Sequence, residues 1–154
     1  MYPGLVPFFD ECKSRAINER WLCHCFGRFR RFPHTSDFTL HSEFERQAMN
    51  FPIQGMVASA VTRAIAYLYN FRINSGTPDM FRILLQIHDA LLLEVPYRHV
   101  EYVAQEVLPW AIREMVPIYP THLDGATTGT GPYRLGVEAE AMKHWGPGPI
   151  PEQM

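Results

Sequence analysis

Residues 82–95, Arg-Ile-Leu-Leu-Gln-Ile-His-Asp-Ala-Leu-Leu-Leu-Glu-Val, decide the fold of this chain. Two apolar runs, 82–87 and 91–95, are separated by only three residues. Runs of this length and spacing are typical of two antiparallel strands joined by a tight turn. The stretch therefore predicts a buried β-hairpin, and it places Asp89 at the tip.

Helical periodicity flanks this hairpin on both sides. Before it, residues 43–71 predict one long helix, with a break or kink near Phe51 because Pro52 lacks a backbone N–H and disfavours helical geometry in the residue before it. After the hairpin, residues 100–115 predict another helix, kinked at Pro109. The apolar stripe of the long helix consists of Ile53, Val57, Ala60, Ala64, Leu68 and Phe71.

The two ends of the chain supply the remaining elements. Residues 5–20 predict a helix, and residues 21–26 and 28–32 predict two short strands around Gly27. A last strand is expected over 134–142. The order helix, hairpin, long helix, hairpin, helix, strand is typical of an α+β domain with antiparallel strands.

Composition excludes several classes of protein. The chain has 154 residues, of which 47% are hydrophobic and 19% charged, which is too apolar for a disordered chain. We find no uncharged apolar run long enough for a membrane helix and no basic segment followed by an apolar one at the start. The three cysteines do not make a disulfide framework. These features predict a soluble, cytoplasmic protein without a membrane partner.

Charge is distributed unevenly along the chain. Residues 1–75 carry nine Lys or Arg and six Asp or Glu, whereas residues 76–154 carry five and ten. Six cations lie between Lys13 and Arg31, three of them, Arg28, Arg30 and Arg31, in the predicted N-terminal hairpin. This asymmetry suggests a polyanionic partner for the first half, although charge alone is equally typical of an ordinary solvated basic face.

Arg46, Asn50 and Gln54 stand four residues apart, so a helix stacks them on one face. All three side chains can donate hydrogen bonds to the acceptors that every base pair presents in the minor groove. The row is therefore suited to reading duplex DNA independently of sequence. The alternative is that any surface helix carries such a polar row.

His88 and Asp89 stand together at the tip of the apolar hairpin, where two strands would hold a carboxylate rigidly. An Asp in a turn commonly serves the turn itself. If this carboxylate is functional, its best use is to bind a hard cation such as Mg²⁺, although one Asp is not a complete site. The His-Asp pair also occurs in phosphohydrolases, but those need further ligands that we do not find.

A zinc site is disfavoured by the sequence. The candidate ligands lack paired Cys-x-x-Cys spacing, and alternate residues of a strand point to opposite faces. These candidates are Cys12, Cys23, His24, Cys25 and His34.

Two long motifs carry a resemblance to a known family. Residues 45–55, Glu-Arg-Gln-Ala-Met-Asn-Phe-Pro-Ile-Gln-Gly, followed by residues 86–95, Gln-Ile-His-Asp-Ala-Leu-Leu-Leu-Glu-Val, closely resemble family A DNA polymerases of the bacterial polymerase I type. Supporting matches are Tyr2-Pro3-Gly4, Gly27 to Pro33, and Val137 to Trp145. The resemblance covers residues 1–146. It implies that residues 1–42 end the fingers, residues 43–146 form the C-terminal palm portion, and residues 147–154 are a loose tail.

The resemblance also implies roles for individual residues. Asp89 matches the palm aspartate that ligates the catalytic magnesium ions, and His88 matches the histidine beside the primer terminus. Arg46, Asn50 and Gln54 match minor-groove and primer-template contacts, the role that their spacing suggests independently. Ala90 departs from the family pattern, in which most members carry Glu after the aspartate. Since that Glu is not an essential metal ligand in the family, we expect tuning rather than inactivation.

Much of the family's catalytic apparatus is missing from this sequence. The second palm aspartate and the fingers helix that binds the incoming nucleotide do not occur in it. Because two-metal phosphoryl transfer needs carboxylates for both ions, we expect the chain to be inactive alone. The resemblance implies a C-terminal subunit or fragment of a template-directed DNA polymerase, working with Mg²⁺, primer-template DNA, deoxynucleoside triphosphates and a complementary chain, or self-associating. The alternative is a non-catalytic nucleic-acid-binding or structural module.

Overall fold

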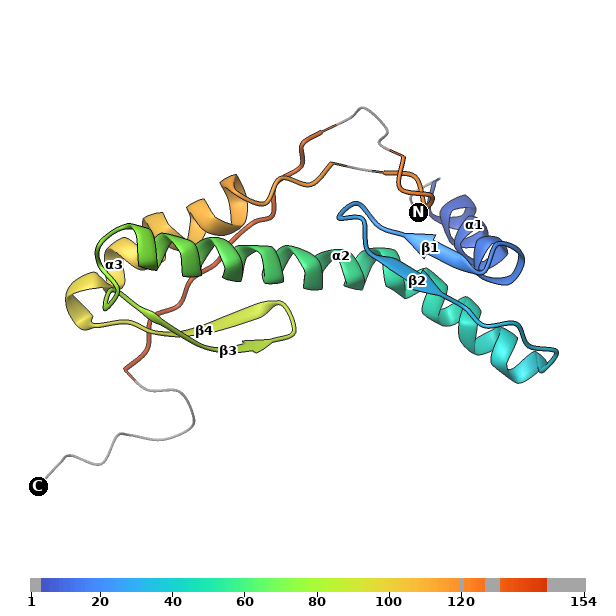
Figure 1. Cartoon of the computed structure of the whole chain (residues 1–154), viewed down its shortest axis with the longest axis horizontal. Helices are drawn as coiled ribbons and strands as arrows, with labels where there is room; N and C mark the ends of the chain where they lie inside the picture. Colours follow the sequence, from blue (N-terminus) through green and yellow to red (C-terminus); the bar gives the residue numbers. More distant parts are fainter. Residues whose placement is uncertain (1–3, 120, 127–130, 144–154) are drawn as a thin grey trace, which may run out of the picture.

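The long helix α2 (Phe38–Asn74) is the element on which the others pack (Figure 1). The computed structural model describes residues 4–119, 121–126 and 131–143, so the tail expected over 147–154 and the match at residues 2–3 lie outside the described residues. Helix α1 (Leu5–Asn18) and the hairpin of β1 (Trp21–Cys23) and β2 (Phe29–Arg31) lie at one end of α2. The hairpin of β3 (Arg82–Ile87) and β4 (Ala90–Glu94) lies at the other end. The α+β class is confirmed.

Helix α2 begins five residues earlier than the expected start at residue 43. Asp37 is the N-cap, and its Oδ1 accepts a hydrogen bond from the backbone N–H of Thr39 at 2.8 Å. This carboxylate satisfies one of the donors that a helix start leaves unpaired, which is why the polar stretch before residue 43 can join the helix. The helix continues through Pro52 without a break, and Figure 1 shows that its first part is inclined to the rest, as expected of a proline kink.

Both hairpins form, but the second is not buried as predicted. Strand β1 pairs with β2 in the register Trp21↔Arg31, and β3 pairs with β4 from Arg82↔Glu94 to Ile87↔Ala90. Each sheet has only these two strands in the described part of the chain, so most of β3 stays exposed. The fold covers only one face of the β3–β4 hairpin, and a single two-stranded sheet cannot bury both.

The segment after β4 is helical, as expected, but much of it is π-helical, with wider turns than an α-helix. It comprises η1 (Tyr97–His99, a 3₁₀ turn), α3 (Val100–Tyr102), and two π-helical segments, η2 (Val103–Val107) and η3 (Trp110–Glu114). Pro109 lies between the two π segments and has no N–H to continue an α-helical ladder.

The strand predicted over 134–142 is wrong. Residues 131–143 contain no strand in the structure, and the nearest approach to one is an isolated bridge between Ile118 and Tyr133. A strand needs a neighbouring edge along its whole length to satisfy its backbone. Residues 138–142 instead line an apolar cavity of about 370 Å³ beside β4 without joining its ladder.

Three clusters of buried side chains divide the length of α2. At the N-terminal end, Cys12, Ala16, Leu22, Phe32, Ala48 and Leu123 pack together; in the middle, Ala60, Ala64 and Val116; at the C-terminal end, Leu68, Met80, Phe81, Val103, Val107 and Ala111. Every cluster includes a side chain of α2. No described helix is long and apolar enough to cross a membrane.

The clusters predict which apolar side chains stabilise the fold. Leu68 is fully buried in the C-terminal cluster, so Leu68→Ala should lower the free energy of unfolding by about 2–5 kcal/mol through lost contacts and a residual cavity. Leu84 is 56% exposed on β3, so Leu84→Ala should change it by less than about 0.5 kcal/mol. Urea denaturation followed by circular dichroism measures both; equal effects would contradict this packing.

Candidate nucleic-acid interface

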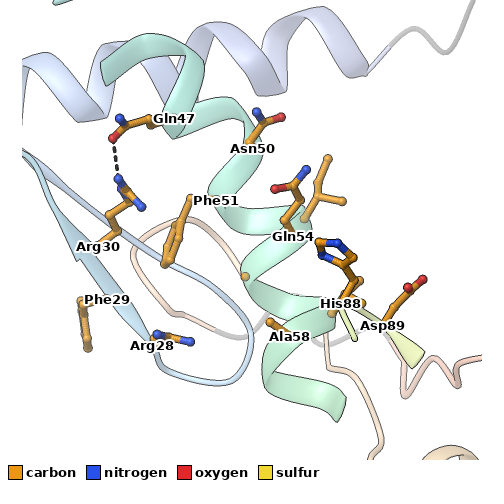
Figure 2. A pocket seen from close by; sticks show the side chains of 13 residues that line it. Arg28, Phe29, Arg30, Gln47, Asn50, Phe51, Gln54, Ala58, His88 and Asp89 are labelled. Carbon is orange, nitrogen blue, oxygen red and sulfur yellow. Dashed lines mark hydrogen bonds between the residues drawn. The ribbon is translucent and has the colours of Figure 1, made fainter. Parts of the chain in front are cut away.

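A cleft of about 860 Å³ brings together three parts of the chain that are distant in sequence. One wall is the polar face of α2, the second is the end of the β1–β2 hairpin, and the turn between β3 and β4 closes one end (Figure 2). The polar residues that line it are Arg28, Arg30, Gln47, Asn50, Gln54, His88 and Asp89. Six of these seven were singled out from the sequence.

The α2 wall carries two of the three residues of the predicted donor row. Asn50 and Gln54 are exposed in the cleft, one helical turn apart. Arg46 does not line it, although it precedes them at the same spacing. Its guanidinium forms an ion pair with Glu43, and its side chain is 70% exposed. The structure therefore brings Asn50 and Gln54 to the cleft and leaves Arg46 outside it.

The three arginines of the β1–β2 hairpin do not all line the cleft. Arg28 and Arg30 line the cleft, whereas Arg31 lines a second hollow with Trp21. The division between Arg30 and Arg31 follows from strand geometry, because successive side chains point to opposite faces of a sheet.

Gln47 is a cleft residue that the sequence analysis missed. Its Nε2 donates a hydrogen bond to Glu43 at 2.8 Å, and its Oε1 accepts one from Arg30 (Figure 2). The side chain thus ties the basic hairpin to α2. Together with Arg46, it also holds the pKa of the Glu43 carboxyl below its usual value, Gln47 having the larger effect. The sequence could have indicated Gln47 as a cleft residue, because it stands three residues before Asn50 and so lies on the same side of a helix.

The turn of the second hairpin presents His88 and Asp89 at one end of the cleft. The turn consists of these two residues only, since Ile87 pairs with Ala90. His88 has φ of +54°, a left-handed conformation that is uncommon for a residue other than glycine. The Gln86 side chain donates a hydrogen bond to the backbone carbonyl of His88 at 3.1 Å. Asp89 therefore stands at the tip, where the sequence placed it.

Asp89 is the metal ligand expected from the sequence. Within residues 4–119, 121–126 and 131–143, no group of three or more His, Cys, Asp or Glu side chains could hold a metal ion. One carboxylate suits a magnesium ion that takes its remaining ligands from substrate phosphates, water and another chain. The donor chemistry fits such a shared site and not a self-contained one.

The cysteines have the character of core residues. Cys12 and Cys23 are buried, and Cys25 is half-buried. Burial, with a smaller contribution from Glu11, raises the pKa of the Cys12 thiol to about 11, and burial also raises the pKa of the Cys23 and Cys25 thiols. Neutral thiols are poor metal ligands and poor nucleophiles.

Comparisons with known proteins find relatives of this chain among DNA polymerases. The sequence profile of DNA polymerase family A matches residues 1–119. DNA polymerase I of Pseudomonas aeruginosa is 32% identical over 146 residues and that of Rhizobium leguminosarum 28% over 148, each match covering 94% of this chain. The chain spans only 13–14% of the length of these two relatives.

A solved structure is similar to most of the described fold. It is the POL domain of Pol1 from M. smegmatis in complex with DNA primer-template and dNTP, which is 25% identical and superposes with a TM-score of 0.68. The match covers 76% of this chain and 20% of that one. With a family profile matched over most of its residues and a related fold, this chain belongs to DNA polymerase family A.

Proposed function

We propose that the chain is the C-terminal palm and fingers portion of a template-directed DNA polymerase, which adds nucleotides to a primer 3′ end with Mg²⁺. The observation that carries the proposal is the single cleft in which Asn50 and Gln54, Arg28 and Arg30, and the His88–Asp89 turn meet. Each group has a separate task in handling a primer-template. Their convergence is what a polymerase site requires.

Duplex contact is assigned to the α2 wall and the hairpin. Side-chain amides such as those of Asn50 and Gln54 can donate to the N3 and O2 acceptors of the minor groove, which are similar for all base pairs. The guanidinium groups of Arg28 and Arg30 suit backbone phosphates, because each neutralised phosphate releases condensed counterions. The likeness to a polymerase domain solved with primer-template DNA and dNTP supports both assignments.

The chemical step is assigned to the turn. The Asp89 carboxylate would ligate a magnesium ion, and His88 would lie beside the primer terminus. A magnesium ion at this place supplies charge stabilisation on the transferring phosphate and a lowered pKa for the attacking 3′ hydroxyl. The two-residue turn keeps the carboxylate in a fixed direction, so little reorganisation is needed when substrate arrives.

A complementary polymerase chain completes the site in this proposal. The described residues offer one candidate carboxylate at the cleft, and two-metal transfer needs more. Strand β3 pairs only with β4 in the described part of the chain and exposes Leu84, Leu85 and Ile87. An apolar sheet edge of this kind is suited to pairing with another strand. The missing palm aspartate and the deoxynucleoside triphosphate site would come with that partner.

Replacing Gln54 by Ala tests the duplex contact. The loss of one minor-groove hydrogen bond should weaken binding of a short primer-template by about 1 kcal/mol, about fivefold in Kd, and equally for AT-rich and GC-rich duplexes. Gln105→Ala is the matched control, because Gln105 is exposed on η2 and does not line the cleft. Fluorescence anisotropy gives both constants; unchanged binding with altered thermal stability would make this helix face structural.

Replacing Asp89 by Asn tests the chemistry. The variant keeps the size of the side chain and removes the charge that would hold the metal, so single-turnover primer extension should fall by orders of magnitude while DNA binding stays near normal. The assay uses the chain assembled with the preceding portion of a family A polymerase. Asp79→Asn, at an exposed position outside the cleft, should leave the rate unchanged, and Ala90→Glu should alter it far less than Asp89→Asn does.

If Asp89→Asn kept a rate within a few-fold of the parent, Asp89 would be a turn residue. DNA binding without any extension by the assembled parent would favour the alternative, a non-catalytic nucleic-acid-binding module.

Replacing Leu84 by Lys tests the sheet edge. The isolated chain should self-associate at micromolar concentration or bind the complementary polymerase portion, and Leu84→Lys should weaken that association about tenfold or more by removing apolar burial. Leu40→Lys is the control, since Leu40 is also exposed but lies in the first turn of α2. Sedimentation velocity measures association; a monomer that binds no polymerase portion would count against the proposal.

A further inference from the structure

The imidazole of His24 is buried directly behind the candidate interface. His24 is 3% exposed and is the one buried polar residue among the described residues. Its Nδ1 accepts a hydrogen bond from the backbone N–H of Phe26 at 3.2 Å. The ring proton therefore sits on Nε2, which donates to Ser59 Oγ at 3.3 Å. Both ring nitrogens are used, one within the hairpin and one on α2.

The main chain of His24 organises the same turn. Its N–H donates to the Arg28 carbonyl at 3.2 Å, and its carbonyl accepts from the Gly27 N–H at 2.8 Å. With the bond from Phe26 to the ring, three of the hydrogen bonds that shape residues 24–28 end on this one residue. The path of the chain into Arg28, and from there into β2, depends on it.

The ring also fixes how close the hairpin lies to α2. It packs against Phe51, with ring centroids 5.3 Å apart, and a Cβ built on Gly55 would lie 3.1 Å from His24 Cδ2. Phe51, Gly55 and Ser59 succeed one another at four-residue intervals; Phe51 and Gly55 line the cleft themselves, and Ser59 follows the cleft residue Ala58. His24 therefore packs on a stripe of α2 that forms part of the cleft wall at Phe51 and Gly55.

We propose that His24 is a positioning residue that, as a neutral imidazole, holds the basic hairpin against α2 so that Arg28 and Arg30 face DNA in the cleft. The proposal rests on the proposed function, since it concerns the same interface. His24 itself touches no nucleic acid in this account. It acts through the two arginines, and Gln47, bonded to Arg30, is the second tie between hairpin and helix.

The surroundings of the ring disfavour its charged form. Arg28 of the hairpin and Arg63 of α2 are the cations that lower the pKa of the ring. His24 also lines an apolar cavity of about 490 Å³ together with Cys23, Cys25, Tyr133 and Arg134. Burial is the larger cause, and the two arginines the smaller, of a pKa for His24 below its ordinary value. Protonation would also remove the acceptor that Nδ1 offers to Phe26.

The lowered pKa of His24 determines how the stability of the folded state depends on pH. A histidine whose pKa is lowered on folding stabilises the folded state fully above about pH 6.5, the ordinary value. This contribution is lost as pH falls through the folded-state pKa. The hairpin should therefore be held at neutral pH and released in acid.

The test measures how primer-template affinity depends on salt for the full chain, by fluorescence anisotropy. His24→Asn retains a short acceptor but cannot reach Ser59, and Ser59→Ala removes the same link from the α2 side; Ser42→Ala, an exposed serine on α2, is the control. We expect His24→Asn and Ser59→Ala to flatten the slope of log K against log salt by up to about 2, the value for two lost phosphate contacts, and Ser42→Ala to leave it unchanged. In a chain that already carries Arg28→Gln and Arg30→Gln, His24→Asn should have no further effect.

Acid titration supplies a second readout. The affinity gap between the wild type and His24→Asn should be largest at pH 7.5 and close as pH falls below the folded-state pKa of His24. Wild-type binding with an unchanged slope in both variants, an additive effect in the arginine background, or a gap independent of pH would overturn the inference and leave the proposed function standing. A wild-type chain that bound no primer-template would overturn both. If His24→Asn failed to fold, Ser59→Ala and the wild-type titration would decide.

Discussion

The continuity of helix α2 across Pro52 is the constraint on which the rest of the structure depends. Proline removes one backbone hydrogen bond and its ring crowds the preceding turn, which costs about 3 kcal/mol in a helix interior. The helix nevertheless runs unbroken from Phe38 to Asn74, with a buried cluster on each side of the proline. Packing at both ends of the helix outweighs the cost of the proline. Both hairpins are therefore held on one helix, and the end of each lines the same cleft.

The candidate interface is built from tips and faces and not from the core. Its cations come from a turn and a short strand, its amides from the exposed side of a helix, and its carboxylate from a two-residue turn. Each group is carried by an element whose other side is packed, which keeps flexible polar side chains on a rigid support. Gln47 and His24 add to this rigidity, because each forms hydrogen bonds that link the β1–β2 hairpin to α2.

Sequence periodicity predicts the helices and hairpins well because each is a local pattern. The α+β class, the tip position of Asp89 and the shared cleft position of Asn50 and Gln54 follow from spacing alone. The errors arise where a long-range partner decides. The strand expected over 134–142 does not form, although residues 138–142 lie beside β4; β3 lacks a cover for its second face; and Arg46 pairs with Glu43. None of these partners can be read from a periodicity.

The absence of a side chain at Gly55 allows the β1–β2 hairpin to lie close to α2. In the middle of a helix a glycine costs about 1 kcal/mol relative to alanine, yet here even a methyl group would stand 3.1 Å from the His24 ring and 3.2 Å from Phe51. An alanine at this position would require the His24 or Phe51 ring to shift by a few tenths of an ångström. The absence of a Cβ at Gly55 thus sets how closely the His24 side of the hairpin can lie against α2, the helix that carries Asn50 and Gln54.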